Sequence, residues 1–376
     1  MDRRTFVFGL SAGGIVATAA VAKTLSSPAI APASGLSSMQ NVRDHGAIGD
    51  GKMADDRAFQ AAVDALPREG GQVYIPPGTY LRTAPTNTHG RAVAFVGAGR
   101  GSTFLKIMHP DNDIFVHSAV ESADFRDFTI FSAVQRTGGA YIRLDPGEGK
   151  INYSSAIERV RTYGHYIGID MVRCSDARVR DCSMIGNAGS FACVLLRNLT
   201  NADSGDNSIS GCFFSGAGGA GIRQESSGGL RLLDNKFNGL ANGLILSPQA
   251  QKQSTSILIV QSNSFENASQ SNILIEQGVG KTIFTYGIIS NNEFAYTPKS
   301  ISVNSDGKTF FDFIISNNIF AVPKKGTGIF LDGGNTFVVT NNIFDAISGD
   351  GISIVKTEKE LNSTIRDNID RNTISH

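Results

Sequence analysis

A four-residue pattern recurs along most of this 376-residue chain and restricts the possible folds more than any other feature. Its second position usually holds Asn or a small residue, and its fourth position holds a bulky apolar residue. The tetrads are Asp127–Ile130, Asp181–Met184, Gly211–Phe214, Asp234–Phe237, Ser262–Phe265, Asn291–Phe294, Asn317–Phe320 and Asn341–Phe344. From Met184 onward, successive fourth residues are 30, 23, 28, 29, 26 and 24 residues apart. Such a period indicates a repeat architecture in which each unit packs on its neighbours.

Short apolar segments flank the tetrads. A β-branched run precedes a tetrad, as in Phe337–Val339, and a segment with apolar residues at every other position follows it, as in Gly328–Asp332. Two or three short strands per repeat predict an all-β fold, a single-stranded, right-handed parallel β-helix of about nine to eleven rungs. A β-propeller would need four strands and about 40–50 residues per blade, and leucine-rich repeats would need a Leu scaffold that is absent.

The composition agrees with stacked rungs. The chain has 23 Phe and 25 Asn, and 19 of the Asn follow Asn198. An Asn at the same turn of each rung can hydrogen-bond the rungs above and below and so satisfy the backbone of the turn. We therefore expect an asparagine ladder at the second tetrad position and a stack of Phe rings at the fourth.

The segment from Asn41 to Thr83 has a different pattern. Asp55 and Asp56 suit the start of a helix, because carboxylates stabilise the first turn. Apolar residues then recur at helical spacing up to Leu66, and a short strand follows at 72–75. This segment predicts a short N-terminal helix that caps one end of the repeat stack.

The first residues have the features of an export signal. Arg3-Arg4 precedes an apolar run from Gly9 to Ala22 that ends in a small-residue cleavage motif. The alternative is a membrane anchor, for which the run is short and rich in Gly and Ala. The sequence predicts a twin-arginine signal over 1–22, a linker over 23–38 and a β-helix domain over 39–376. The protein would then be periplasmic or secreted, with no membrane span after signal cleavage.

Two further stretches, Asn41–Gly51 and Gly70–Tyr80, resemble the opening of pectate-lyase-superfamily proteins, which include family-28-related glycoside hydrolases and phage tailspike depolymerases. The resemblance implies a right-handed parallel β-helix that acts on a polysaccharide. It does not define the reaction, because the superfamily includes hydrolases, lyases and epimerases. The Asn-Thr-Asp, Gly-His-Gly and Arg-Ile-Lys motifs of polygalacturonases are absent, as is the Asp-Pro-His-Glu of epimerases. The repeat region also lacks their Asp-Asp pair, since Asp55-Asp56 belongs to the predicted cap. No catalytic residue can therefore be assigned by motif.

The strand after each tetrad supplies the candidate site, because superfamily members usually bind substrate over one sheet. We aligned these strands by inward apolar pairs, such as Ile142/Leu144, Ile167/Ile169 and Val194/Leu196, and the residues next to each pair point outward. The first outward set is Asp145, Asp170, Arg197, Glu225, Ser247, Glu276, Asn304, Asp332 and Val355. The second set contains Arg143 and Arg223.

Three functions fit these outward residues. A hydrolase would use Asp170 and Glu225 as acid and base, at a separation typical of inverting enzymes, or the closer Asp145 and Asp170 as in retaining enzymes. A lyase would use Arg197 or His165 to remove a proton α to a uronate carboxylate, and the acidic residues would hold Ca²⁺. A non-catalytic polysaccharide-binding protein is the third, and the absence of Trp favours it, since Trp is a preferred sugar platform.

The remaining candidates surround this ladder. Arg143, Arg197 and Arg223 suit anionic sugars, and Glu276 and Tyr166 extend the predicted substrate-binding surface. His165 is the predicted proton shuttle. Each also has a structural interpretation, because alternating charges protect an exposed strand face from aggregation.

Other features limit the partners and cofactors. Zero net charge, with 34 basic and 34 acidic residues, argues against nucleic-acid binding. The sequence shows no metal motif, so we expect no cofactor apart from Ca²⁺ if the protein is a lyase. A homo-oligomer is compatible with the sequence. Cys182 and Cys212 share a ladder position and would form either a disulfide or two buried thiols in place of Asn.

Overall fold

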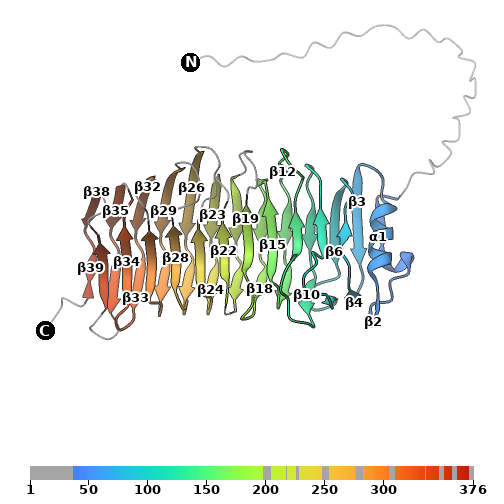
Figure 1. Cartoon of the computed structure of the whole chain (residues 1–376), viewed down its shortest axis with the longest axis horizontal. Coiled ribbons are helices and arrows are strands. Elements are labelled where there is room, and N and C mark those ends of the chain that lie inside the picture. Colours follow the sequence, from blue (N-terminus) through green and yellow to red (C-terminus); the bar gives the residue numbers. More distant parts are fainter. Residues whose placement is uncertain are drawn as a thin grey trace, which may run out of the picture. The chain divides into compact units, whose positions relative to one another are not determined.

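The computed structural model describes residues 37–197, 205–216, 218–225, 228–247, 254–276, 283–304, 310–334, 336–346, 351–357 and 362–371. The predicted export signal and nearly all of the predicted linker lie outside these residues. The described chain winds into a parallel β-helix, as predicted, and its strands stack side by side along the long axis (Figure 1). Each turn of the winding is here called a rung. Every rung contributes one strand to sheets A and B, and all except the first and the last also contribute one to sheet C.

Sheet A consists of β1 (Met39–Asn41), β3 (Gly70–Ile75), β6 (Ala92–Gly97), β9 (Asp124–Arg126), β13 (Ala156–Glu158), β17 (Arg178–Arg180), β20 (Asn207–Ser210), β23 (Gly229–Leu233), β26 (Ser254–Gln261), β29 (Ile283–Ser290), β32 (Phe310–Ser316), β35 (Thr336–Thr340) and β38 (Asn362–Arg366). Sheet B consists of β2 (Asp50–Ala54), β4 (Gly78–Arg82), β7 (Thr103–Ile107), β10 (Thr129–Ser132), β14 (Arg161–Tyr163), β18 (Ser183–Ile185), β21 (Phe213–Ser215), β24 (Lys236–Asn238), β27 (Ser264–Glu266), β30 (Glu293–Ala295), β33 (Ile319–Val322), β36 (Ile343–Ala346) and β39 (Ile369–Asp370).

Sheet C consists of β5 (Thr86–Asn87), β8 (Phe115–His117), β11 (Ala140–Leu144), β15 (Ile167–Val172), β19 (Ala192–Arg197), β22 (Ala220–Gln224), β25 (Asn242–Leu246), β28 (Ser271–Glu276), β31 (Lys299–Asn304), β34 (Thr327–Asp332) and β37 (Ile352–Lys356). A small parallel pair, β12 (Asn152–Tyr153) and β16 (Cys174–Ser175), lies between sheets C and A in the chain order.

The tetrads form the turns from sheet A to sheet B. Their first residues have positive φ angles, for example 56° at Asp234 and 57° at Asn291, a conformation that Asn and Asp tolerate better than most residues. Their second residues form the predicted ladder. The Nδ2 atom of each ladder Asn donates to Oδ1 of the next at 3.0 Å, and this series runs through Asn235, Asn263, Asn292, Asn318, Asn342 and Asn368.

The fourth tetrad residues form the predicted aromatic stack in the core. Ring centroids of consecutive residues lie 5.0, 4.4, 5.2, 4.8 and 4.7 Å apart along the series Phe214, Phe237, Phe265, Phe294, Phe320 and Phe344. All these rings are buried. Stacked rings therefore fill the interior behind sheet B over six successive rungs.

Two cysteines continue the asparagine ladder. The backbone N–H of Cys182 donates to Sγ of Cys212 at 3.4 Å, and the N–H of Cys212 donates to Oδ1 of Asn235 at 3.0 Å. Both cysteines are buried free thiols, so the structure favours thiols in place of Asn over a disulfide. Burial and the neighbouring Cys182 raise the pKa of the Cys212 thiol, which is inert chemically in that form.

The predicted cap is present at the N-terminal end (Figure 1). A short 3₁₀ helix, η1 (Val42–His45), is followed by α1 (Asp56–Asp64), which buries Phe59 against Tyr80 at a centroid distance of 5.6 Å. Arg82 is buried beneath the helix, where its Nε donates to Oδ1 of Asp56 at 2.8 Å. Within the described residues, no helix is long and apolar enough to cross a membrane.

Candidate functional site

The outer face of sheet C carries the candidate residues, but in a register that differs from the predicted one. Ile142 pairs with Ile169, where the sequence alignment had placed Ile167. Ile167 instead packs on the outside, in an apolar group separate from the core with Ala140, Ala192 and Leu195. Our alignment of that rung was therefore wrong by two residues.

The corrected register changes which candidates are neighbours. Asp170 pairs with Arg143 on one side and with Leu195 on the other, and Leu195 pairs with Arg223. Residues that are register partners across successive strands of sheet C are here called a column. Arg197 lies in the next column along the strand direction, opposite Val172, and Glu225 occupies that same column on the following rung. Asp170 and Glu225 therefore occupy different columns, and they do not form the aligned carboxylate pair that we predicted.

The first group of charges, here called the Asp170 cluster, is built around a buried carboxylate. Asp170 is 1% exposed. Arg197 binds it through both oxygens, with Nε donating to Oδ1 at 2.8 Å and Nη2 donating to Oδ2. Arg143 approaches Oδ2 of Asp170 to 3.5 Å and donates to Oδ2 of Asp145 at 3.0 Å. Arg173 holds the other oxygen of Asp145 at 2.5 Å.

Burial and ion pairing have opposite effects in this cluster. Burial raises the pKa of Asp170, although Arg197 and Arg143 oppose that shift. At the more exposed Asp145, the hydrogen bond from Arg143 and the charge of Arg173 outweigh burial and lower the pKa. The aspartates likewise raise the pKa of Arg143 despite its partial burial. The cluster is therefore a connected network in which each carboxylate has a cationic partner.

A second group, here called the Phe191 cluster, lies on the next rungs. Tyr166 and Phe191 stack with centroids 6.0 Å apart, and the Arg223 guanidinium lies 5.6 Å from the centre of the Phe191 ring. Nε of Arg223 donates to Oε1 of Glu225 at 2.6 Å, and its Nη2 lies 3.8 Å from Oε1 of Glu276. A phenol ring and a guanidinium thus pack against one partly exposed ring, and two carboxylates lie near that guanidinium.

Each predicted catalytic or substrate-binding residue except His165 therefore lies in one of these two clusters. Sequence reasoning missed Phe191 and Arg173. Phe191 precedes β19 in a loop, outside the alternation that identifies outward strand residues. Arg173 directly follows β15, and its position as a basic residue at the end of an outward-facing strand was the only sequence feature that could have identified it.

His165 is buried in the turn between β14 and β15. Its Nδ1 shares a hydrogen bond with Oγ1 of Thr162 at 3.1 Å, and its Nε2 has no hydrogen-bond partner among the residues that the structure describes. Burial, with a smaller effect from Arg136, lowers the pKa of His165 to about 3. A fully buried neutral imidazole cannot reach a substrate on the outer face, so we do not retain His165 as a proton shuttle.

This burial predicts a pH-dependent stability. In the unfolded chain His165 takes up a proton near its ordinary pKa of 6.5, whereas the folded protein keeps it neutral down to about 3. The contribution of neutral His165 to the free energy of unfolding is thus fully present above pH 6.5. It is lost as the pH falls toward 3, by up to about 1.4 kcal/mol per pH unit. We expect His165→Gln to reduce this slope in urea unfolding measured between about pH 7 and pH 5. The exposed His89→Gln serves as control, and equal slopes in wild type and His165→Gln would contradict the prediction.

A calcium site does not fit these residues. Within the described part of the chain, no three His, Cys, Asp or Glu side chains come together in a group that could hold a metal ion. The carboxylates of both clusters are directed at arginines instead. We therefore assign no step of a reaction to Ca²⁺.

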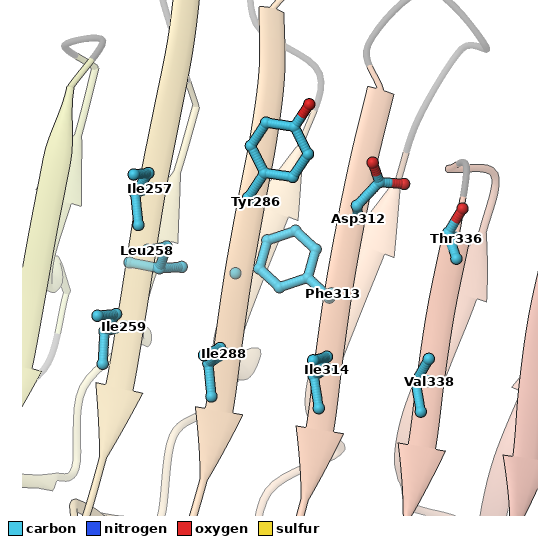
Figure 2. A pocket seen from close by; sticks show the side chains of 11 residues that line it. Ile257, Leu258, Ile259, Tyr286, Ile288, Asp312, Phe313, Ile314, Thr336 and Val338 are labelled. Atoms are coloured by element: carbon cyan, nitrogen blue, oxygen red, sulfur yellow. The ribbon is translucent and has the colours of Figure 1, made fainter.

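A separate hollow of about 360 Å³ lies on the outer face of sheet A. Figure 2 shows its lining side chains along β26, β29, β32 and β35, with Ile259, Ile288 and Ile314 in one row. Gly287 pairs with Phe313 in the neighbouring row, and the Phe313 ring lies over this glycine at the floor of the hollow. The other lining residues are aliphatic apart from Tyr286, Asp312 and Thr336, and no arginine lines the hollow.

Comparison with known proteins identifies the family. The profile of rhamnogalacturonase A/epimerase, pectate-lyase-like proteins matches residues 39–270, which is more than half of the chain. The chain belongs to this family. The sequence-based resemblance to the pectate-lyase superfamily is thereby confirmed, and the pectate-lyase-like family includes proteins with several reactions on one fold.

Curated relatives are enzymes of alginate chemistry. Alginate lyase 7 of Azotobacter vinelandii is 33% identical over 139 residues, a match that covers 32% of this chain and 16% of the lyase. Mannuronan C5-epimerase AlgE6 of the same organism is 35% identical over 138 residues, covering 32% of this chain and 16% of the epimerase. The chain thus spans only a small part of these relatives.

Solved structures support the fold over nearly the whole chain. The A-module of AlgE6 aligns with a TM-score of 0.56 at 16% identity, covering 88% of this chain and 99% of the module. PfbA, a surface adhesin of Streptococcus pneumoniae, aligns with a TM-score of 0.63 at 16% identity, covering 88% of this chain and 91% of the adhesin. At this identity the likeness concerns the fold alone. The chain is thus a pectate-lyase-like parallel β-helix that is similar in sequence to alginate lyase 7 and to mannuronan C5-epimerases.

Proposed function

We propose that this protein acts on a uronate-containing polysaccharide as a lyase. The Phe191 cluster carries the proposal, because a phenol and a guanidinium pack against one partly exposed aromatic ring and the guanidinium binds a carboxylate. The sequence similarity to alginate lyase 7 and to mannuronan C5-epimerases supports it, since elimination and C5 epimerisation both begin with loss of the proton at C5. These relatives favour a lyase over the hydrolase that we placed first from the sequence.

Each group of the cluster has a role in this reaction. Arg223 binds the uronate carboxylate of the reacting sugar and stabilises the negative charge that develops when the C5 proton leaves. Arg143, three strands away on the same face, binds the carboxylate of another uronate of the polymer. Glu225 accepts that proton. Tyr166 donates its hydroxyl proton to the oxygen at C4 as the C4–O bond breaks, and a double bond forms between C4 and C5. Arg197, which sequence analysis considered as the base, is held by Asp170 and instead positions that carboxylate beside Arg143.

The test is turnover of polyuronates measured by two readouts together. A lyase produces new reducing ends and an unsaturated product that absorbs in the near ultraviolet. We expect Arg223→Gln and Glu225→Gln each to lower turnover by about 100-fold, the size of effect seen when one charge-stabilising group is lost. Arg231→Gln, on the outer face of sheet A, is the matched control. Reducing ends without absorbance would indicate a hydrolase, and unchanged turnover in both variants would exclude this site.

A non-catalytic binding protein is the second candidate, and one observation favours it. Every carboxylate in the two clusters lies 3.8 Å or less from an arginine nitrogen, which leaves no independent acid–base pair. The adhesin fold similarity is compatible with this function. Polyuronate binding without any product would support it.

We also propose that the protein is exported by the twin-arginine pathway to the periplasm or the medium, where such polymers occur. The signal at Arg3-Arg4 supports this location. Loss of export after Arg3→Lys/Arg4→Lys would test it, with the mature protein measured in the periplasmic and extracellular fractions.

A further inference from the structure

The outer face of sheet B differs in charge from that of sheet C. The seven consecutive strands from β4 to β24 contain no Asp or Glu. Their outward positions include Lys106, Arg161 and Lys236, of which Lys236 pairs with Glu266 of the following strand at 3.2 Å. Sheet C, in contrast, carries Asp170 among its outward residues and Glu225 just beyond β22. A carboxylate-free strip on a chain of zero net charge is a local feature that attracts anions.

Aromatic side chains accompany these cations. A hollow of about 440 Å³ opens on β4, β7, β10 and β14, and Phe104, Phe131 and Tyr163 line it together with Thr79, Thr129 and Ser132. Phe131 and Tyr163 are register partners on adjacent strands, so their Cα atoms are about 4.8 Å apart and their side chains are neighbours on the outer face. Tyr163 is 38% exposed. Ring faces next to hydroxyl groups suit the mixed apolar and polar surface of a pyranose.

The cation nearest to the hollow is available for a ligand. Arg161 is the register partner of Thr129 and shares the outer face with Tyr163, two residues further along β14. In the described parts of the chain, Arg161 has no carboxylate within ion-pair distance, unlike the arginines of both clusters on sheet C. Lys106 faces Phe131 across the β7–β10 pair, and among the described residues its Nζ donates only to the backbone carbonyl of Gly51, at 3.4 Å.

We propose that this face of sheet B is a second binding site, which takes a segment of an anionic, uronate-containing polysaccharide. The identity of the polymer rests on the proposed function. The hollow stacks sugar rings, and Arg161 and Lys106 bind their carboxylates. The site is continuous with the Phe191 cluster, because only Gly164, His165 and Tyr166 separate β14 from β15. The Cα atoms of Tyr163 and Tyr166 are therefore at most about 11 Å apart.

A second site for the same chain raises affinity for long polymers without any change at the reacting sugar. A long chain can cover the faces of sheet B and sheet C together, whereas a short oligomer bound at the Phe191 cluster leaves most of the sheet B face unoccupied. The double variant Tyr163→Ser/Arg161→Gln removes the stacking ring and the free cation. Neither side chain makes a hydrogen bond to the described residues, so the fold should tolerate the change.

The experiment compares binding of a long polyuronate by calorimetry with turnover of a short oligouronate. We expect the double variant to bind the polymer about tenfold more weakly or worse, with turnover of the short oligomer unchanged. A second variant, Arg143→Gln/Arg223→Gln, should lose turnover yet keep residual polymer binding, and combining all four changes should abolish that binding. The matched control is Tyr153→Ser/Arg231→Gln, two exposed residues away from sheet B.

Several outcomes would overturn the proposal. Polymer binding by the double variant equal to wild type would do so, as would an equal loss in the control. Equally tight binding of a neutral glucan, or equal competition by single-stranded DNA, would contradict an anionic sugar as the ligand. If wild type shows no turnover but the double variant still loses polymer binding, the proposed lyase function fails while the second site stands.

Discussion

Replacement of Asn292 by Ala should lower the free energy of unfolding by about 3 kcal/mol. In the folded protein Oδ1 of Asn292 accepts from the backbone N–H of Asn263 at 2.9 Å, and Nδ2 donates to the carbonyl of Val260 at 2.9 Å. Alanine leaves both groups buried and unpaired, and each unsatisfied group costs about 1–3 kcal/mol. Urea unfolding followed by circular dichroism measures the loss.

The matched control is Asn238→Ala. Asn238 ends a sheet B strand outside the buried ladder, and its Oδ1 accepts a hydrogen bond from Nδ2 of the exposed Asn267 at 3.2 Å. This change should alter stability by no more than about 0.5 kcal/mol. Equal effects of the two substitutions would show that the ladder does not stabilise the fold. A change in the slope of unfolding would instead show that the rungs unfold in separate steps.

The ladder also explains why the architecture was predictable. A rung repeats because each buried turn needs the same amide at the same place, so the requirement appears directly as a periodic Asn. The Phe stack follows for the same reason, since each ring needs a ring above and below. The capping helix was predictable because Asp56 begins it and Phe59 and Leu66 face the core at helical spacing.

The register of sheet C was not predictable in the same way. A shift of two residues keeps every side chain on its original face, so alternation alone cannot distinguish Ile167 from Ile169 as the partner of Ile142. Only packing decides, and Ile167 is buried by neighbours on the outer face. The error moved Asp170 by one column and created a carboxylate pair with Glu225 that the protein does not have.

The loops limited the prediction of the candidate site further. Phe191 organises Tyr166 and Arg223, yet it lies in a loop whose residues follow no period. We expected His165 to reach a substrate because it directly precedes a strand with outward-pointing candidate residues, but the turn buries its side chain in the interior. Sequence periodicity defines which strand residues point outward, and it carries no information about side chains supplied by connections.

Replacement of Arg197 by Met on sheet C should lower the free energy of unfolding by about 3–5 kcal/mol. The substitution leaves the carboxylate of Asp170, which is 1% exposed, with only Arg143 at 3.5 Å. Breaking a buried pair from one side is costly because the remaining charge keeps its desolvation penalty. The control is Arg180→Met, which removes an exposed pair with Glu158 and should cost no more than about 1 kcal/mol.

The double variant Asp170→Leu/Arg197→Met separates stability from function. With both charges replaced by apolar groups, stability should return to within about 1 kcal/mol of wild type, since a buried pair often contributes little net free energy. If stability returns and polyuronate turnover does not, the pair exists to hold Arg143 beside the substrate. If turnover returns as well, the pair is only structural, and the Phe191 cluster acts without it. A double variant as unstable as Arg197→Met would contradict the assignment of the loss to an unpaired buried charge.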